Sequence, residues 1–385
     1  MSIVSNVPLL DLTRFDTDVE AELSVAFAKV LKSGMYVMGP ELTAFESECV
    51  KYMGVRHALG VSSGTDALLL AMMSLGVGAG DEVICPSFTF FATAGSIWRL
   101  GAKPVFVDSS LSDFNVLANS VEAAITPRTK AIMPVHLFGQ CVDMDPLLQI
   151  AGRVNVAIVE DAAQAIGATW RDHQSGSMGK FGCFSFFPTK NLGALGDGGL
   201  VTTNDDTLAQ KARVLRVHGG EPKYYHSMVG GNFRLDALQA ALLRVKMKRL
   251  DRLTEMRQQN AAKYCTLLAK AKIGAPNHGQ TKTDALVLYP VSVQSRHTYN
   301  QFVIRVVDGK RDALRKHLSD RKIGTEIYYP VPLHRQACFA SLKSCPTAFP
   351  NAERLANEVL ALPIFPELRV DEIEYVVDSI SSFYR

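Results

Sequence analysis

One lysine stands in a setting that suits covalent chemistry. Lys190 follows an apolar run containing Ser185, and glycines come directly after it at positions 193, 196, 198 and 199. Glycines allow backbone to approach closely from several sides, and such crowding excludes water from an amine. Desolvation lowers the pKa of a lysine, so the neutral amine that forms an imine becomes available. A loop lysine is usually solvated, yet this one is the leading candidate for an imine-forming residue.

The segment that begins at Val61 predicts a helix N-terminus that can hold a phosphate. Gly64 and Thr65 follow two serines and precede an apolar run, and Asp66 lies in the first turn. Amides in the first turn have no partner inside the helix and attract anions. A good N-cap on an ordinary core helix explains the same residues. This segment alone therefore decides nothing.

Acidic residues end two of the predicted strands. Glu160 and Asp161 close the run at 156–161, Gln164 follows one turn later, and Asp108 closes the run at 104–108. Doubly wound folds bind their ligands at the carboxyl edge of the sheet, where such side chains gather. A strand-terminal aspartate is also often only a helix cap, so Asp161 and Asp108 remain competitors.

Together these segments supply what pyridoxal phosphate requires. They offer a phosphate cradle, an imine-forming lysine, and a carboxylate that keeps the pyridine nitrogen protonated so that the ring accepts electrons. Phe88, Phe90 and Phe91 follow a predicted strand, and one of them can stack on the ring. The sequence thus indicates a pyridoxal-phosphate enzyme.

The elements around these residues predict an α/β core. Short apolar runs without polar alternation are typical of strands buried on both faces, which indicates a mostly parallel sheet of the doubly wound type. These runs lie at residues 82–86, 104–108, 131–135, 156–161, 182–187 and 199–203.

The pattern changes after the core. Residues 235–268 have apolar positions at helical spacing and basic residues on the other face, which predicts one long bridging helix. A strand at 299–306 and helices at 310–321 and 370–383 then predict a smaller α+β domain. The boundary near residue 245 depends on this change of pattern.

Composition excludes several classes of protein. The 385 residues carry a net charge of +3, too little for a nonspecific nucleic-acid surface. No apolar stretch reaches the roughly 18 residues of a membrane span, and the amino terminus has no secretion signal, so a cytoplasmic protein is expected. The seven cysteines are scattered and never form a C-x-x-C pair, so we expect reduced thiols and no metal site.

Read in order, the segments resemble the nucleotide-sugar aminotransferases of the DegT type. The resemblance depends on SSGTDAL, PSFTFFATA, VEDAAQAIG, FSFFPTKNLGALGDGG and GGNFRLDALQAA, and it extends to YYPVPLHRQACF and LALPIFPEL near the end. It implies the aspartate-aminotransferase-like fold of pyridoxal-phosphate enzymes, known as fold type I. Residues 1–245 would form the large cofactor-binding domain with its N-terminal segment, and residues 246–385 the bridging helix and small C-terminal domain.

The resemblance also implies roles for individual residues. Lys190 would hold the cofactor and move protons, Asp161 would pair with the pyridine nitrogen, and Gln164 would reach the ring hydroxyl. Other cofactor contacts would come from Gly64, Thr65, Phe90, Ser185 and Asn232. Among them, Phe90 would stack on the ring, and Asn232 would reach the phosphate from a neighbouring subunit. Such a shared site implies an obligatory homodimer.

The implied activity is amino transfer from glutamate to a nucleotide-linked keto-sugar, for amino-sugar and surface polysaccharide biosynthesis such as that of lipopolysaccharide. Residues 328–339, with Tyr329 and His334, resemble the sugar-facing stretch of relatives that aminate carbon 3. We therefore favour a 3-keto uronic acid or a 3-keto-6-deoxyhexose. Arg234 is a further substrate candidate, and Arg296 and Arg335 suit a uronate carboxylate or a diphosphate.

Other functions stay open at this point. They are a 4-keto-sugar aminotransferase, a pyridoxal-phosphate-dependent sugar dehydratase, and a noncatalytic regulator on the same fold. Lys190 disfavours the dehydratase, because such relatives carry histidine at that position. A dinucleotide-binding oxidoreductase is rejected, because glycines 76, 78 and 80 follow a predicted helix instead of the first strand.

Overall fold

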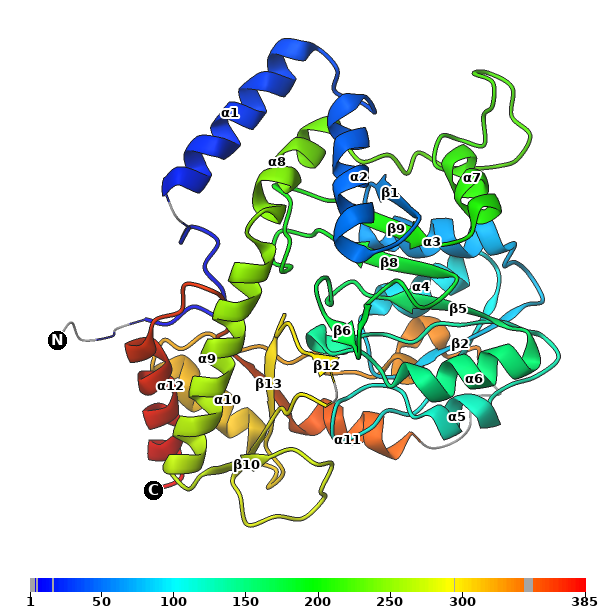
Figure 1. Ribbon diagram of the computed structural model, residues 1–385. Helices are drawn as coiled ribbons and strands as arrows, with labels where there is room; N and C mark the ends of the chain where they lie inside the picture. Colours follow the sequence, from blue (N-terminus) through cyan, green and yellow to red (C-terminus); the bar gives the residue numbers. More distant parts are fainter. Residues whose placement is uncertain (1–3, 5, 16, 294, 343–348) are drawn as a thin grey trace.

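A seven-stranded sheet forms the centre of the computed structural model, which describes residues 4, 6–15, 17–293, 295–342 and 349–385. The strand order is β1-β9-β8-β5-β4-β2-β3, and neighbours from β8 to β3 run parallel, whereas β9 is antiparallel to β1 and β8 (Figure 1). The strands are β1 His57–Val61, β2 Glu82–Pro86, β3 Lys103–Val107, β4 Thr129–Ile132, β5 Ala157–Asp161, β8 Phe181–Ser185 and β9 Gly199–Thr203. The predicted mostly parallel sheet is confirmed.

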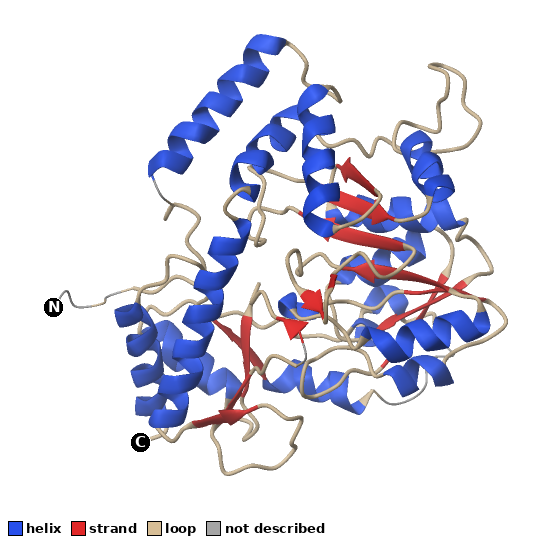
Figure 2. Cartoon of the chain, in the orientation of Figure 1, coloured by secondary structure: helices blue, strands red, loops and turns tan. Residues whose placement is uncertain are grey.

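Helices cover both faces of this sheet (Figure 2). Successive strand residues point to opposite faces, so Val83 and Cys85 pack in one core cluster and Ile84 packs in another. The first cluster contains α3 (Gly64–Leu75), α4 (Phe91–Arg99) and α7 (Asp206–Leu215). The second contains α2 (Pro40–Met53), α6 (Met144–Val154) and α8 (Ala237–Met247), and α5 (Ala118–Ala123) contributes Val121 to it. This double cover explains why the strands lack polar alternation.

A second, smaller sheet lies in the C-terminal part of the chain. Its order is β10-β11-β13-β14, with bounds Gly274–Pro276, Val287–Tyr289, Phe302–Arg305 and Val359–Leu362. The helices of this part are α9 (Leu250–Lys270), α10 (Arg311–Asp320), α11 (Pro350–Glu358) and α12 (Val370–Phe383). A third sheet joins β12 (Ser295–Arg296) to β6 (Thr169–Trp170) and β7 (His173–Gln174). The predicted helices at 310–321 and 370–383 are present as α10 and α12.

The single bridging helix predicted over residues 235–268 is wrong. The chain forms two helices, α8 and α9, which are separated at Lys248 and Arg249. Arg249 pairs with Glu22 at 2.6 Å on α1 (Thr17–Ser33), the N-terminal helix that packs against α8 (Figure 1). No glycine or proline marks this break, so only the tertiary structure reveals it. The strand predicted at 299–306 is also shorter, because Tyr299 has a φ of 44° and stacks on His297.

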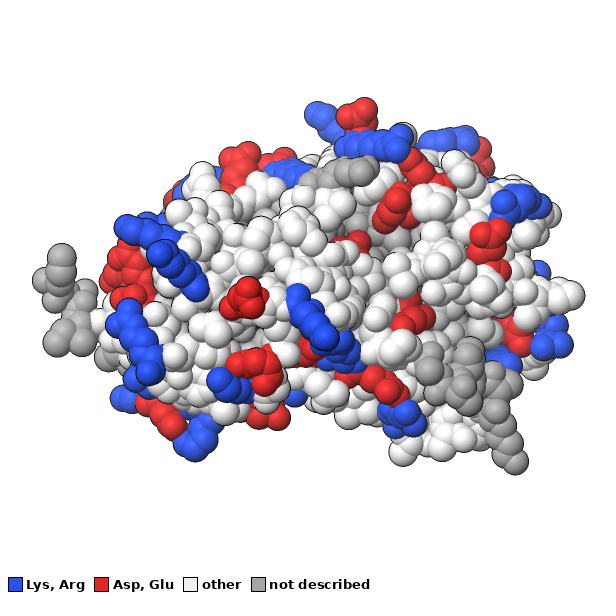
Figure 3. Space-filling view, turned by 90° about the horizontal axis from the view of Figure 1, so that it is seen from below, with Lys and Arg blue, Asp and Glu red and all other residues white. Residues whose placement is uncertain are grey.

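The surface carries mixed charge. On the face drawn in Figure 3, basic and acidic side chains are interspersed. In the described ranges, no helix combines the length and the apolarity that crossing a bilayer requires. Within the same ranges, no three His, Cys, Asp or Glu side chains are grouped in a way that would hold a metal ion. The described cysteines form no disulfide bond, and Cys345 lies outside the described residues.

Candidate active site

Lys190 lies on the tight loop that joins β8 to β9. Glycines make this loop possible: a Cβ atom on Gly193 would collide with the Pro188 carbonyl, and one on Gly199 would lie 2.5 Å from the Ser63 carbonyl oxygen. Burial of the Lys190 amine lowers its pKa from 10.5 to about 8, and the negative charge of Asp161 opposes that shift. The loop thus presents an amine that is easily deprotonated, as imine formation requires.

The lowered pKa predicts how cofactor uptake depends on pH. With a pKa of about 8, roughly a tenth of the Lys190 amine is neutral at pH 7, about three hundred times the fraction for an ordinary lysine. The rate at which apoprotein binds pyridoxal phosphate covalently should therefore rise about tenfold per pH unit below 8 and level off above it. Stopped-flow visible absorbance measures that rate. A midpoint near 10 would contradict this environment for Lys190.

Asp161 ends β5 and is buried. Its Oδ2 accepts a hydrogen bond from Thr93 Oγ1 at 2.8 Å, and its Oδ1 accepts one from the Ala163 amide at 3.2 Å. Burial raises the pKa of Asp161, while these two hydrogen bonds and the charge of Lys190 act in the opposite direction. The structure therefore brings the carboxylate and the lysine amine into one electrostatic environment at the carboxyl edge of the sheet.

Gln164 has a defined orientation beside Asp161. Its Oε1 accepts a hydrogen bond from the Phe138 amide at 2.7 Å, and its Nε2 donates one to Tyr329 Oη at 3.2 Å. Tyr329 packs between Phe88 and Phe90, with ring centroids 6.0 and 6.2 Å away. Phe90 itself is 58% exposed. Gln164, Phe90 and Tyr329 thus come together from three distant parts of the chain.

The residues predicted to cradle a phosphate lie where α3 meets β8. Ser63 caps α3 by accepting a hydrogen bond from the Asp66 amide at 3.1 Å. A Cβ atom on Gly64 would lie 2.7 Å from Ser185 Cβ, so glycine is needed for the helix start to reach this serine. First-turn amides and the Ser185 hydroxyl therefore converge, a donor set that fits a phosphate group. The residues present would fit pyridoxal phosphate, because this donor set suits its phosphate and the Lys190 amine and the Asp161 carboxylate interact with each other, as groups that serve its ring would have to.

Replacing Gly64 with alanine should weaken the cradle. The added methyl group must displace Ser185 or the start of α3, since the two Cβ atoms would lie only 2.7 Å apart. We expect about tenfold weaker binding of pyridoxal phosphate and a loss of about 1–3 kcal/mol of stability. Cofactor titration and urea unfolding measure these effects. Gly78→Ala is the matched control, because its Cβ would meet nothing within 4 Å, and an equal effect there would refute the cradle.

Asn232 and Arg234 lie together beside the start of α3. Both border a cavity of about 530 Å³ that Ser62, Ser63 and Asp66 also line. The backbone holds them there, because Val61 bridges to Arg234 along the edge of the sheet. Within one chain, these two predicted residues therefore belong to the same region as the helix start.

The predicted sugar-facing residues occupy different environments. The ring nitrogens of His334 contact Ser87 Oγ at 2.5 Å and Glu353 Oε1 at 3.2 Å. Arg335 also pairs with Glu353, whereas Arg296 pairs with Asp251 at 2.7 Å, away from Glu353. Of these predicted residues, Tyr329 is the one in direct contact with a predicted cofactor residue.

The sequence analysis missed Thr93, and the residue pattern left Asp161 and Asp108 as competitors until the family resemblance favoured Asp161. Asp108 accepts hydrogen bonds from the amides of Asn351 at 3.0 Å and Ala352 at 2.8 Å, so it caps α11. Asp161 has Lys190 nearby instead. No local pattern connects Thr93 with Asp161, because the two residues are 68 positions apart and meet only in the folded chain.

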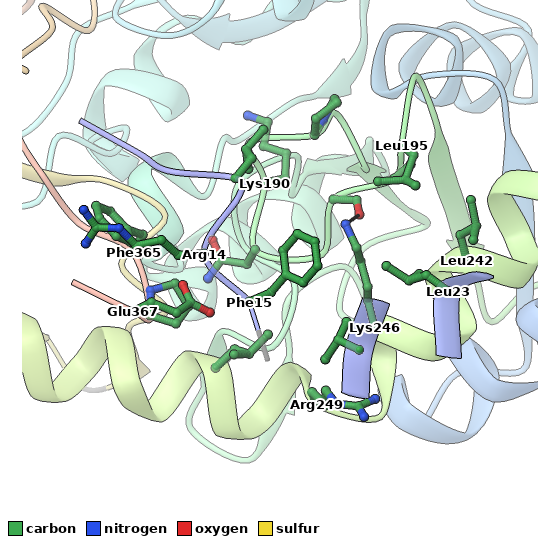
Figure 4. Close-up of a pocket in the computed structure, with 18 of the residues that line it drawn as sticks. Arg14, Phe15, Leu23, Lys190, Leu195, Leu242, Lys246, Arg249, Phe365 and Glu367 are labelled. Atoms are coloured by element: carbon green, nitrogen blue, oxygen red, sulfur yellow. Dashed lines mark hydrogen bonds between the residues drawn. The ribbon is translucent and has the colours of Figure 1, made fainter. Parts of the chain in front are cut away.

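A further cavity of about 530 Å³ borders the lysine loop. Lys190 lies at one end of it and Phe15 in its middle, with Leu23, Leu242 and Phe365 among the apolar walls (Figure 4). The N-terminal segment, α1, α8 and α9 supply most of these walls. The lysine loop therefore lines a mainly apolar cavity that Asp161 does not border.

Comparison with known proteins gives consistent matches over nearly the whole chain. The family model described as the DegT/DnrJ/EryC1/StrS aminotransferase family matches residues 17–381. A pleiotropic regulatory protein of Geobacillus stearothermophilus is 47% identical over 99% of both chains. A dTDP-3-amino-3,4,6-trideoxy-alpha-D-glucose transaminase of Streptomyces venezuelae is 42% identical over 97% of this chain and 95% of its own.

A solved structure extends the likeness to three dimensions. DesV of S. venezuelae superposes with a TM-score of 0.91 at 41% identity, covering 98% of each chain. This likeness covers both the large sheet and the smaller C-terminal sheet, so both belong to the shared fold.

Proposed function

We propose that this chain, which belongs to the DegT/DnrJ/EryC1/StrS aminotransferase family, transfers an amino group from glutamate to a nucleotide-linked 3-keto sugar. It is a pyridoxal-phosphate-dependent aminotransferase with the fold of that family. The donor, the carbon that is aminated and the sugar are our proposal. The observation that supports it most is the meeting of Lys190, Asp161 and the cradle at Gly64 on one edge of the sheet.

Each residue has a separate task in this proposal. When bound, pyridoxal phosphate supplies an electron-accepting ring that stabilises negative charge on the carbon next to the transferred nitrogen. Lys190 holds the cofactor and then carries a proton to and from that carbon, for which a pKa of about 8 suits neutral pH. Asp161 keeps the ring nitrogen protonated, and Gln164 donates to the ring hydroxyl. Phe90 packs on the ring face, and the Gly64 cradle holds the phosphate.

Carbon 3 is supported by the Streptomyces venezuelae relative, whose name specifies a 3-amino sugar. The likeness of residues 328–339 to sugar-facing stretches points to the same carbon. Tyr329 and His334 would border the sugar, and Arg234 would meet its charged groups. A 3-keto uronic acid and a 3-keto-6-deoxyhexose are both within this proposal. The product would enter surface polysaccharide biosynthesis, and the reaction would take place in the cytoplasm.

The proposal includes a homodimer in which Asn232 serves the partner's site. Apolar side chains near the cavity of Asn232 support it, because Met35, Tyr36 and Val37 are each about half exposed. Exposed apolar residues of this kind mark interaction surfaces.

Hybrid dimers test this arrangement directly. Lys190→Ala and Asn232→Ala homodimers are each expected to be impaired, and they are mixed under conditions that exchange subunits. If Asn232 acts across the interface, each hybrid contains one fully native site and activity returns. If Asn232 acts within its own chain, both sites of the hybrid stay defective. Absence of recovery, with subunit exchange verified, would refute the shared site.

A noncatalytic regulator is a second candidate, because a relative at 47% identity is named a pleiotropic regulatory protein. The half-reaction separates the two functions without any sugar. An aminotransferase mixed with glutamate converts bound cofactor to its pyridoxamine form and releases one equivalent of 2-oxoglutarate. A regulator that retains only the pocket gives neither product. The Lys190→Ala variant is the negative control.

A further inference from the structure

The carboxylate of Asp161 is held by a threonine on a different element. Thr93 lies in the first turn of α4 and is fully buried, with its Oγ1 2.8 Å from Asp161 Oδ2. The Thr93 hydroxyl must donate here, because an ionised carboxylate only accepts hydrogen bonds. A charged acceptor makes this bond stronger than a neutral one.

A second threonine completes the arrangement. Thr89 Oγ1 lies 3.3 Å from Thr93 Oγ1, and both side chains are buried. Since the Thr93 proton is committed to Asp161, Thr89 is the donor in this contact. The Ala163 amide donates to the other carboxylate oxygen at 3.2 Å. Both oxygens of Asp161 are thus fixed by donors from two sides, which sets the plane of the carboxylate.

The same turn also presents the proposed stacking residue. Phe90 is the N-cap of α4 and is exposed, whereas Thr89 and Thr93, one residue before and three after, face the interior. One local structure therefore places an aromatic ring and the donor to Asp161 in a fixed relation. Any shift of this turn moves both together.

We propose that Thr93 is a positioning residue, whose hydroxyl holds the charged Asp161 carboxylate in the orientation that pairs with the pyridine nitrogen. This inference rests on the role proposed above for Asp161. The ionisable groups near the carboxylate are Lys190, His136, Glu160, Cys183 and Tyr329. Within the described part of the chain, none of these side chains donates a hydrogen bond to it; the donors are Thr93 and the Ala163 amide. The Thr93 hydroxyl is therefore the side-chain donor that determines its orientation.

Thr93→Val removes the hydroxyl and keeps the shape of the side chain. We expect the affinity of apoprotein for pyridoxal phosphate to fall about 10- to 100-fold, the range for a hydrogen bond to a charged group. The ¹⁵N chemical shift of labelled cofactor in the holoenzyme should move toward that of an unprotonated pyridine nitrogen. Thr93→Ser keeps a donor and should restore both values. Thr93→Ala, which leaves a void instead of a methyl group, is the second variant if valine impairs folding.

Thr202→Val is the matched control. It removes another fully buried threonine hydroxyl, which bonds to the Gly176 carbonyl at 2.6 Å and does not contact Asp161. Its cofactor affinity and ¹⁵N shift should equal those of the wild type. Suppose that Thr93→Val and Thr93→Ala also have the cofactor affinity and ¹⁵N shift of the wild type, while Asp161→Asn does not. The inference about Thr93 is then overturned, and the role proposed for Asp161 stands. If Asp161→Asn retains both values too, the role proposed for Asp161 fails.

Discussion

Lys190→Ala should lower the rate of transamination by about 10²- to 10⁴-fold, the contribution expected of a positioned acid–base group. The variant loses both the amine that attaches the cofactor and the proton carrier. Borohydride reduction followed by mass spectrometry should fix the cofactor to Lys190 in the wild type and to no residue in the variant. Single-turnover kinetics with glutamate measure the loss.

Two further variants separate the amine from its charge. Lys190→Arg keeps a positive charge near Asp161 but cannot supply a neutral amine at ordinary pH, so it should be as inactive as alanine. Lys180→Ala removes an exposed lysine whose nearest acidic partner is Asp205 at 3.8 Å, and it should retain full activity. An active Lys190→Arg enzyme would disprove the covalent role of this lysine.

Asp161→Asn should lower activity by at least about a hundredfold, because the isosteric amide cannot pair as an anion with the pyridine nitrogen. Bound cofactor should also lose the signature of a protonated ring. A residue with only a structural role would not change that signature. Kinetics and the ¹⁵N shift of labelled cofactor provide the two measurements.

Although Asp161→Asn should lower activity, it should not lower the stability of the apoprotein. Burial raises the pKa of Asp161 above 3.8, so the folded apoprotein binds this proton more tightly than the unfolded chain does. This group therefore contributes stability at low pH that is lost as the pH rises through its folded pKa. Asparagine does not titrate, so the Asp161→Asn apoprotein should be at least as stable as the wild type at pH 7.

Asp108→Asn is the control for this prediction. Asp108 follows β3 as Asp161 ends β5, but it caps α11. In the asparagine variant an NH2 group replaces the oxygen that accepts from one of the two amides, so the change should cost about 1 kcal/mol of stability and leave the cofactor signature unchanged. A loss of cofactor signature in Asp108→Asn, with none in Asp161→Asn, would reverse the roles assigned to the two aspartates.

Much of the core could be predicted because its elements follow local rules. Strands buried on both faces give unbroken apolar runs, and the bounds of β9 and of α12 agree with those expected. Strand β1 was not among the predicted runs. The antiparallel course of β9 was not predicted either, because strand direction is set by the loop at Lys190 and not by composition.

Tertiary contacts determine the features that sequence patterns missed. The separation of α8 from α9 coincides with the ion pair between Arg249 and Glu22, which are 227 positions apart. The hydrogen bond from Thr93 to Asp161 spans 68 positions, and that from Gln164 to Tyr329 spans 165. Motif order indicated that Lys190 and Asp161 act together, but only the folded chain identifies which side chains orient them.

The most direct test of the account measures both products of one reaction. Holoenzyme is incubated with glutamate and one nucleotide sugar. In one reaction the sugar carries its keto group at carbon 3, and in a separate reaction at carbon 4. We expect one equivalent of 2-oxoglutarate for each amino sugar, with the 3-keto substrate converted faster. Turnover of the 4-keto sugar alone would contradict amination at carbon 3, and sugar conversion without 2-oxoglutarate would contradict glutamate-dependent transamination itself.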